Sequence, residues 1–176
     1  RQMLIQDPGE FETAVFRLRG AERFALDTEF MRERTYHPQL CLVQIGTESD
    51  CYLFDPLAGL DLAPLHDLLA DRSKFKILHA ARQDLEVMLL SGGTVPGPLF
   101  DTQVAAAFLG FPPQVGYAEL VARQLGASID KGQTRTDWSR RPLTPAQLAY
   151  AADDVRHLLT LHKDLQAALA AQGRTE

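Results

Sequence analysis

Cysteine is scarce in this sequence, and neither a long apolar run nor a low-complexity tract is present. With only Cys41 and Cys51 among 176 residues, a disulfide framework is not expected, and both thiols are predicted to be free. No stretch reaches the roughly 20 apolar residues that a membrane-spanning helix needs. No signal-peptide pattern opens the sequence either. We therefore expect a cytoplasmic protein that does not interact with membranes.

Several active-site motifs are also missing. There is no glycine-rich phosphate loop, no Cys/His spacing typical of zinc sites and no nucleophile elbow around a serine. The sequence offers no signal for the chemistry that depends on these motifs, and its carboxylates become the main candidates for a functional site.

The composition is that of one globular domain. Hydrophobic residues make up 45% and charged residues 23% of the chain, which allows a sizeable core. No internal repeat or interdomain linker is visible, so residues 1–176 are predicted to form a single domain. The net charge of −5 is unusual for a nucleic-acid-binding protein, which normally needs a basic face. Two bound divalent cations would offset most of this charge, so acidity alone does not exclude a polyanionic substrate.

Hydrophobic periodicity predicts an α/β domain. Strands are expected at residues 4–5, 24–30, 40–46, 51–55 and 76–79. Helices are expected between Asp7 and Gly20 and at residues 61–70, 82–90, 102–109 and 117–125, followed by an irregular stretch at 126–142 and one long helix over residues 144–169. Because hairpin-paired strands come first and strand–helix units follow, the sheet should be mixed and covered by helices. The pattern does not determine the order of the strands.

The first candidate site lies in the strand at residues 24–30. Side chains alternate along a strand, so Asp27 and Glu29 share a face and lie about 6.5 Å apart along it. Two carboxylates this close repel each other, and each raises the pKa of the other unless a cation lies between them. Hard divalent cations such as Mg²⁺ prefer such oxygen ligands. A strand end that runs into solvent would show the same Asp-x-Glu pattern, so the motif alone does not establish a site.

Two further segments carry acidic residues that can join the first. A short strand ending at His79 precedes a helix that begins near Arg82, which places Asp84 in the first turn, where the helix dipole favours an acid whatever its function. In the last helix, Tyr150 and Asp154 are four residues apart and share a face. A packed tyrosine beside a surface acid would give the same spacing.

Taken together, these segments resemble the tyrosine-bearing branch of the DEDD superfamily of 3′→5′ exonucleases, and most closely its ribonuclease D family. The resemblance covers nearly the whole chain. It is carried by Leu26-Asp27-Thr28-Glu29-Phe30, Tyr36-His37-Pro38-Gln39-Leu40, Leu42-Val43-Gln44-Ile45, Leu78-His79-Ala80 with Asp84-Leu85-Glu86, Phe100-Asp101-Thr102-Gln103, Arg135-Thr136-Asp137-Trp138, Arg141-Pro142-Leu143 and Tyr150-Ala151-Ala152-Asp153-Asp154. It implies a ribonuclease H-like fold, with a mixed sheet flanked by helices, and a two-metal phosphodiesterase.

The resemblance also implies a set of site residues. Asp27, Glu29, Asp84 and Asp154 match the four acids that bind two divalent ions, Mg²⁺ or Mn²⁺, and Tyr150 matches the tyrosine that orients or deprotonates the attacking water. Two ions about 4 Å apart stabilise the attacking and leaving oxygens of an in-line displacement. Asp27 is expected to bridge the ions, with Glu29 and Asp154 completing the hydrolytic site and Asp84 on the other ion. Since free tyrosine has a pKa of about 10, positioning is the expected larger role of Tyr150.

Further residues are expected to contact the substrate: Phe30, Gln44, His79 and Arg135. His79 and Asp84 also form the His-x4-Asp spacing of the last motif in the histidine-bearing branch of the superfamily. That motif closes its domain, whereas this pair lies mid-chain and would leave Tyr150 and Asp154 unexplained, so we reject it. His79 is then expected to act mainly as a structural hydrogen-bonding residue.

Two segments, residues 32–37 and 131–141, are more basic than the rest of the chain. Their basic residues are Arg32, Arg34, His37, Lys131, Arg135, Arg140 and Arg141. They are interrupted by Thr35, Tyr36 and Trp138, whose side chains could pack or stack on a base. Solvated charges and a Trp138 that packs in the fold are the simpler interpretation.

The predicted function is a metal-dependent 3′→5′ exoribonuclease domain that removes mononucleotides from single-stranded 3′ ends, as in the maturation of transfer-RNA precursors or in RNA turnover. The alternatives are a 3′→5′ DNA exonuclease and a catalytically idle nucleic-acid-binding module on the same fold. The four acids and the tyrosine weigh against the idle module. A monomer is expected. Bacterial ribonuclease D usually carries C-terminal helical domains that help to bind RNA, and residues 1–176 do not include them, so an excised domain and a short family member both remain open.

Overall fold

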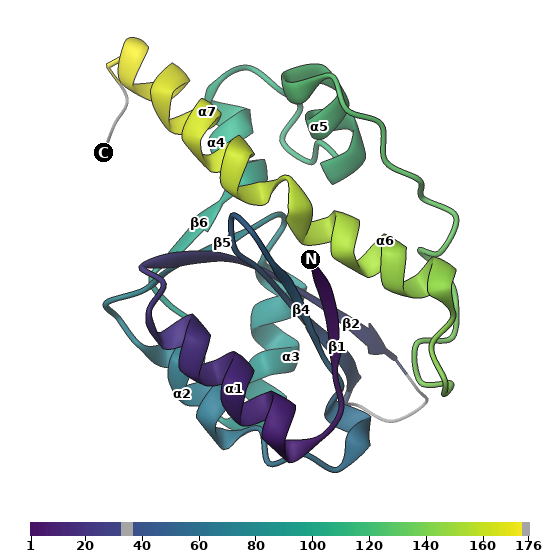
Figure 1. Cartoon of the computed structure of the whole chain (residues 1–176). Coiled ribbons are helices and arrows are strands. Elements are labelled where there is room, and N and C mark those ends of the chain that lie inside the picture. The colour runs from purple at the N-terminus through teal and green to yellow at the C-terminus, as the bar shows by residue number, and fades with distance from the viewer. Residues whose placement is uncertain (33–36, 174–176) are drawn as a thin grey trace.

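The computed structural model describes residues 1–32 and 37–173 (Figure 1). The predicted contributions of Arg34, Thr35 and Tyr36 lie outside these residues. Within the described residues, six strands form one sheet: β1 (Gln2–Ile5), β2 (Arg23–Met31), β3 (Gln39–Gly46), β4 (Cys51–Phe54), β5 (Phe75–Leu78) and β6 (Leu99–Asp101). The strand order is β1-β4-β3-β2-β5-β6, so the first strand lies at an edge of the sheet.

The sheet is mixed, which confirms the prediction from the order of elements in the sequence. β2, β3 and β4 pair antiparallel, whereas β1 pairs parallel with β4, β5 with β2 and β6 with β5. Parallel neighbours need a crossover connection, which is usually helical. The pairing of β5 with β2 ends at Ala25, so β5 leaves the rest of that edge of β2 open to other elements.

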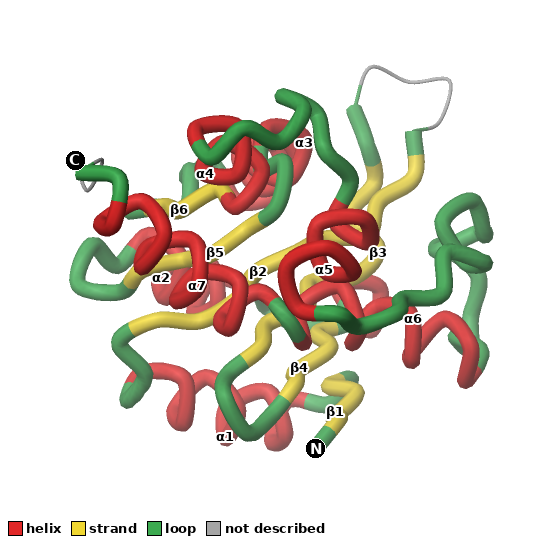
Figure 2. Tube along the Cα trace, turned by 90° about the horizontal axis from the view of Figure 1, so that it is seen from above, coloured by secondary structure: helices red, strands yellow, loops and turns green. Residues whose placement is uncertain are grey.

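Helices cover both faces of the sheet. They are α1 (Pro8–Arg19), α2 (Ala63–Ala70), α3 (Arg82–Gly92), α4 (Thr102–Phe108), α5 (Tyr117–Leu125), α6 (Pro145–Arg156) and α7 (Leu158–Ala171), with a short 3₁₀ turn η1 (Pro56–Ala58). Helices α1 to α3 pack on one face and α4 to α7 on the other (Figures 1 and 2). The predicted α/β class is therefore confirmed. None of the helices in the described part of the chain has both the length and the apolar character of a membrane span.

The alternation of side chains along β2 divides them between two cores. Phe24 and Leu26 are buried against α1 to α3, whereas Ala25 lies in the core formed with α4 to α7. Asp27 and Glu29 continue the series of Ala25 and so share its face. A slip of one residue would exchange the two faces, so the burial of large apolar side chains on one side holds the register of the strand.

The C-terminal helical region differs from the single long helix that the sequence predicts. α6 ends at Arg156 and α7 begins at Leu158 because the hydroxyl of Tyr117 donates to the carbonyl of Asp153 (2.6 Å) and accepts from the amide of His157 (3.4 Å). In a continuous helix, that amide would donate to that carbonyl. A side chain inserted in this way breaks or kinks a helix. The prediction was wrong because no local signal marks the break.

Cys41 and Cys51 are both free, which confirms the prediction. Cys51 pairs with Gly46 across the β3–β4 hairpin, so the turn does not set the two cysteines opposite each other. Burial raises the pKa of Cys41 to about 11 and that of Cys51 to about 12. Both residues are therefore protonated, weakly reactive thiols at neutral pH.

Candidate metal centre

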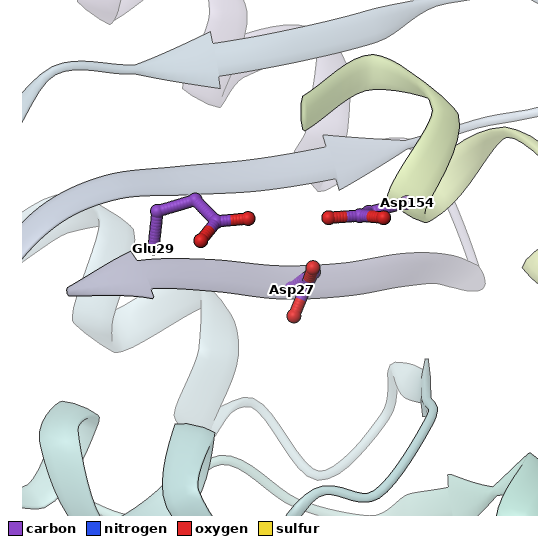
Figure 3. A group of neighbouring side chains, drawn as sticks. All are labelled: Asp27, Glu29 and Asp154. Atoms are coloured by element: carbon purple, nitrogen blue, oxygen red, sulfur yellow. The ribbon is translucent and has the colours of Figure 1, made fainter. Parts of the chain in front are cut away.

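Three carboxylates meet where β2 faces α6. Asp27 and Glu29 project from β2 and Asp154 from α6, and one oxygen atom of each lies within 4.8 Å of the other two (Figure 3). The start of α6 is held by a capping box, in which Thr144 accepts from the amide of Gln147 and the side chain of Gln147 accepts from the amide of Thr144. The capped start defines which face of α6, and hence which acid, points at β2.

Asp84, the fourth predicted acid, reaches the site from the other face of the sheet. It lies in the first turn of α3, and its carboxylate accepts a hydrogen bond from the hydroxyl of Thr28. Asp84 is not in the group of three whose oxygen atoms lie within 4.8 Å, but its charge is among the causes that raise the pKa of Asp27. The structure thus places all four predicted acids around the open edge of β2.

The four acids perturb one another because they lie close together in a partly buried site. Burial is the largest cause, and with mutual repulsion it raises the pKa of Asp27 well above its usual range and that of Glu29 to about 9. Burial also raises the pKa of Asp84 and of Asp154 to about 6, although hydrogen bonds from neighbouring side chains oppose the shift. Without a cation, such a cluster retains protons at neutral pH, and a bound cation would displace them.

The donor atoms suit a hard divalent cation. Carboxylate oxygens are the preferred ligands of Mg²⁺, Mn²⁺ and Ca²⁺, whereas structural zinc sites use Cys and His. Among the described residues, only Asp27, Glu29 and Asp154 form a group with metal-ligand spacing, and it contains neither cysteine nor histidine. The residues present therefore fit the metal that the sequence predicts.

Gln44 lies beneath the carboxylates. It pairs with Asp27 across β2 and β3, its side chain is fully buried, and its amide nitrogen lies 3.5 Å from an oxygen of Asp27 and 3.4 Å from one of Glu29. A donor shared by two carboxylates reduces their repulsion. This position favours a role in which Gln44 holds the two acids in place, rather than the predicted role of contacting the substrate.

A pocket of about 460 Å³ opens over the acids. It is lined by Asp27, Thr28, Glu29, Phe30, Met31, His79, Ala80, Gln83, Asp84, Thr134, Arg135, Thr136, Trp138, Tyr150 and Asp154. Every predicted site residue except Gln44 is in this lining, although the residues come from distant parts of the chain. The acidic floor and polar walls suit a polar ligand.

One wall of the pocket is formed by the irregular segment at residues 126–142, the wall segment, which supplies Thr134, Arg135 and Trp138. The side chain of Trp138 is 2% exposed and packs against the ring of Tyr150, with 5.9 Å between centroids. The prediction that Trp138 packs in the fold is therefore confirmed. The hydroxyl of Tyr150 lies 3.1 Å from that of Thr134, so the wall contacts the tyrosine at two points.

Arg141 anchors this wall to the sheet. Its guanidinium donates to the two carboxylate oxygens of Asp55, at 2.9 and 2.7 Å, and to the carbonyls of Cys41 and Trp138. Burial alone would raise the pKa of Asp55, but hydrogen bonds from Arg141 and Gln6 hold it below its usual range. A bidentate pair of this kind fixes orientation as well as distance.

Both ring nitrogens of His79 are engaged in hydrogen bonds. Nε2 lies 2.8 Å from the carbonyl of Val115, to which it must donate, and Nδ1 lies 2.8 Å from the hydroxyl of Thr102. Burial lowers the pKa of His79, which favours a neutral ring, and the hydroxyl of Thr102 also lies 3.2 Å from the carbonyl of Leu78. These contacts agree with a structural role, even though His79 lines the pocket.

Comparison with known proteins identifies the family of this chain. The family model described as 3′-5′ exonuclease matches residues 3–170. The chain belongs to the 3′-5′ exonuclease family. The ribonuclease D of Gluconacetobacter diazotrophicus is 50% identical over 175 residues, which are 99% of this chain and 44% of that protein.

Solved structures agree with this assignment to the exonuclease family. The crystal structure of Escherichia coli RNase D, an exoribonuclease involved in structured RNA processing, has a TM-score of 0.94 and 42% identity and covers 98% of this chain and 46% of that one. Brucella melitensis NrnC, solved bound to pGG and with bound Mg²⁺, has TM-scores of 0.83 and 0.81 at 31% and 30% identity, covering 99% of this chain and 82% of its own. The predicted resemblance to ribonuclease D and the ribonuclease H-like fold are confirmed. The chain spans less than half the length of the ribonuclease D relatives.

Two hydroxyl groups of the acidic pocket were not predicted from the sequence. Thr28 donates to Asp84, although its position between Asp27 and Glu29 on the strand directs it to the opposite face. Thr134 contacts Tyr150 from the wall segment. A buried polar residue on the core face of a strand is a signal that could have pointed to Thr28. Nothing local distinguishes Thr134.

The turn between β5 and α3 was also missed. Ala80 has a φ of 56°, which is uncommon for a residue other than glycine. The carboxylate of Asp101 holds this turn by accepting from the amides of Ala80 and Ala81, at 3.0 and 2.9 Å. The strained turn lets the chain leave β5 toward the start of α3, where Asp84 lines the acidic pocket.

Proposed function

We propose that this domain is a divalent-metal-dependent 3′→5′ exoribonuclease that releases mononucleotides from single-stranded 3′ ends. The observation that carries the proposal is the convergence of Asp27, Glu29 and Asp154 within 4.8 Å at the floor of a pocket that also presents Asp84 and Tyr150. Similarity to ribonuclease D supports RNA as the substrate, and NrnC with bound Mg²⁺ supports the metal.

Two ions, Mg²⁺ or Mn²⁺, are the proposed cofactors. Asp27, Glu29 and Asp154 would hold the first, and Asp27 with Asp84 the second. When bound, such ions stabilise the charge that develops on the attacking and leaving oxygens of a phosphodiester. The contribution of the chain is orientation, because Gln44 and the strand geometry hold the carboxylates before the substrate arrives.

The substrate would enter as a free strand end. Phe30 and the wall segment flank the acids, so a terminal nucleotide can lie beyond them with the scissile phosphate over Asp27. Arg135 supplies a positive charge to the same pocket, which suits a phosphate. Tyr150 would orient the attacking water, and positioned groups of this kind typically contribute about 10²–10⁴-fold to the rate. An internal phosphate of a duplex could not reach this arrangement.

The physiological setting is part of the proposal. Precursors of transfer RNA and other structured RNAs are the proposed substrates, supported by the similarity to ribonuclease D. The two free thiols support a reducing, cytoplasmic location. A monomer is the proposed state, which analytical ultracentrifugation would test.

Cleavage of matched 5′-labelled RNA and DNA oligonucleotides, with Mg²⁺, Mn²⁺ or chelator, tests the proposal. We expect a metal-dependent ladder on RNA that shortens one nucleotide at a time from the 3′ end. A 3′-phosphate should inhibit, because its extra charge falls near Asp27 and Glu29. The net charge of −5 should make binding weak and salt-sensitive, and the action therefore distributive.

Four outcomes would contradict the proposal. Shortening from the 5′ end, or cleavage of a circular RNA, would refute the polarity. Full activity in chelator would refute the metal dependence. A clear preference for the DNA oligonucleotide would favour a DNA exonuclease. Binding without cleavage of either substrate would favour the idle module.

A further inference from the structure

The hydroxyl of Tyr150 has one hydrogen-bond partner among the described residues, the hydroxyl of Thr134, at 3.1 Å. Tyr150 comes from α6, whereas Thr134 comes from the wall segment 16 residues earlier. Considered alone, either hydroxyl could be the donor. The direction of this bond determines what the tyrosine can offer to a water molecule in the pocket.

A second hydrogen bond of Thr134 decides that direction. Thr134 Oγ1 donates to the carbonyl of Lys131, at 2.8 Å, and a carbonyl can only accept. A threonine hydroxyl has a single proton, so toward Tyr150 it can only accept. Tyr150 therefore donates its proton to Thr134, and the lone pairs of its oxygen remain available to another donor.

The ring of Tyr150 is held independently of this bond. Trp138, itself buried, packs against it with 5.9 Å between ring centroids and 39° between the planes. The position of the phenolic oxygen is thus set by packing, and the direction of the O–H bond is the freedom that remains. The contact with Thr134 removes that freedom.

We propose that Thr134 is a positioning residue that sets the hydrogen-bond polarity of Tyr150, so that the phenolic oxygen accepts a hydrogen bond from the attacking water. The inference rests on the proposed exonuclease function and deepens it. A water that donates to Tyr150 directs a lone pair toward the scissile phosphate. No proton is transferred to the phenol in this arrangement, because its own proton stays in the bond to Thr134.

Kinetics of four variants test the inference: Thr134→Val, Thr134→Ser, Tyr150→Phe and the double variant Thr134→Val/Tyr150→Phe. The kcat and KM for a single-stranded RNA are measured with Mn²⁺, and Mn²⁺ binding is measured by calorimetry. Thr13→Val, an exposed change on α1, is the matched control. Because Thr134 is exposed, the variants should fold, and Thr134→Ala is made in parallel as a second variant without the hydroxyl.

Thr134→Val should lower kcat about tenfold, as expected for the loss of one hydrogen bond. KM and Mn²⁺ affinity should stay within about twofold of the parental values, and Thr134→Ser should retain the parental kcat. In the Tyr150→Phe background, Thr134→Val should have no further effect, because the group through which it acts is gone.

Several results would overturn the inference. One is a parental kcat in Thr134→Val and Thr134→Ala, and another is an equal loss of kcat from Thr134→Val in the parental and Tyr150→Phe backgrounds. A third is a Thr134→Ser variant as slow as Thr134→Val. A fourth is a raised KM at constant kcat in Thr134→Val, which would mean direct contact with the substrate. An inactive parental protein would overturn the proposed function and the inference with it. An active parental protein with an unaffected Thr134→Val would overturn the inference alone.

Discussion

Asp27 is the residue at which the requirements of stability and of chemistry oppose each other most directly. It is half-buried, and desolvation together with the charges of Asp84, Asp154 and Glu29 raises its pKa. Without a cation, ionisation of this side chain is therefore unfavourable in the folded protein. A residue that destabilises the fold to this extent is typical of a functional site.

Asp27→Asn should change stability and activity in opposite directions. We expect the rate of cleavage to fall by more than about a hundredfold. A ligand shared by two cations supports several kcal/mol of the charge stabilisation that both cations give to the transition state. In chelator the same variant should unfold at a higher temperature, because a neutral amide of the same shape avoids the cost of keeping a carboxyl group protonated among the other acids at neutral pH. Cleavage assays and thermal unfolding in chelator measure the two effects.

Asp67→Asn is the control for Asp27→Asn, because Asp67 is exposed on α2 and its replacement should change neither property. Parental cleavage by Asp27→Asn would contradict the metal site. A lower unfolding temperature in chelator would contradict the raised pKa of Asp27.

At the scale of elements, the division of the C-terminal helix into α6 and α7 depends on Tyr117. Its hydroxyl bridges the carbonyl of Asp153 and the amide of His157, next to the site residue Asp154. The ring of Tyr117 also lies 5.8 Å from that of His79. One side chain thus connects the end of β5, the start of α5 and the helix that carries an acid of the site.

Tyr117→Phe should destabilise the protein by about 1–2 kcal/mol, because it removes a hydroxyl that satisfies two backbone groups. For a chain of this size, that loss corresponds to a fall in Tm of roughly 2–8 °C. Tyr52→Phe is the matched control, since Tyr52 is buried but its hydroxyl makes no hydrogen bond within the described residues. Equal Tm values for the two variants would contradict the bridging role.

The wall segment is a second element whose position depends on one residue. Arg141→Lys keeps the charge but loses the planar fork that contacts both oxygens of Asp55. We expect a loss of roughly 1.5–3 kcal/mol in the free energy of unfolding, measured in urea. Arg140→Lys, at the exposed neighbouring position, should leave stability unchanged. A similar loss in both variants would show that the Asp55 contact is not what holds the segment.

At the scale of the whole molecule, the carboxylate cluster should govern how stability depends on pH. Glu29, with a pKa of about 9, and Asp27, with a raised pKa, retain protons in the folded protein without a cation, whereas in the unfolded chain both ionise at a pH of about 4. Between these values the folded state binds more protons than the unfolded state. The free energy of unfolding must therefore fall as pH rises through this window.

In chelator, Tm should decrease from pH 6.5 to pH 8, because the free energy of unfolding falls by up to about 1.4 kcal/mol per pH unit for each retained proton. Below this range, histidines with lowered pKa values such as His66 and His79 act in the opposite direction, and above it Lys76, whose pKa is about 8, does so as well. Excess Mg²⁺ should flatten the slope because the cation replaces the protons. Glu29→Gln should flatten it in chelator. A Tm that rises with pH in chelator would contradict the prediction.

The sequence by itself determined the features whose signals are local. The alternation of Asp27 and Glu29 on one strand face follows from a period of two, and the caps of α1 and α6 follow from Asp7 and Thr144 placed just before proline. The mixed sheet follows from the order of hairpin and strand–helix units. The five residues matched to the family motifs could likewise be named from short patterns, and the structure places them around one pocket.

Only the tertiary structure decided the features that depend on pairs of residues far apart in the chain. The break between α6 and α7 needs Tyr117, the hydrogen bond of Asp84 needs Thr28, and the polarity of Tyr150 needs Thr134. Each depends on a distance between two elements that no periodicity encodes. Most N–H···O hydrogen bonds in proteins join a donor and an acceptor that lie about 2.7–3.2 Å apart. That condition is set by the packing of helices on the sheet rather than by the residues on either side.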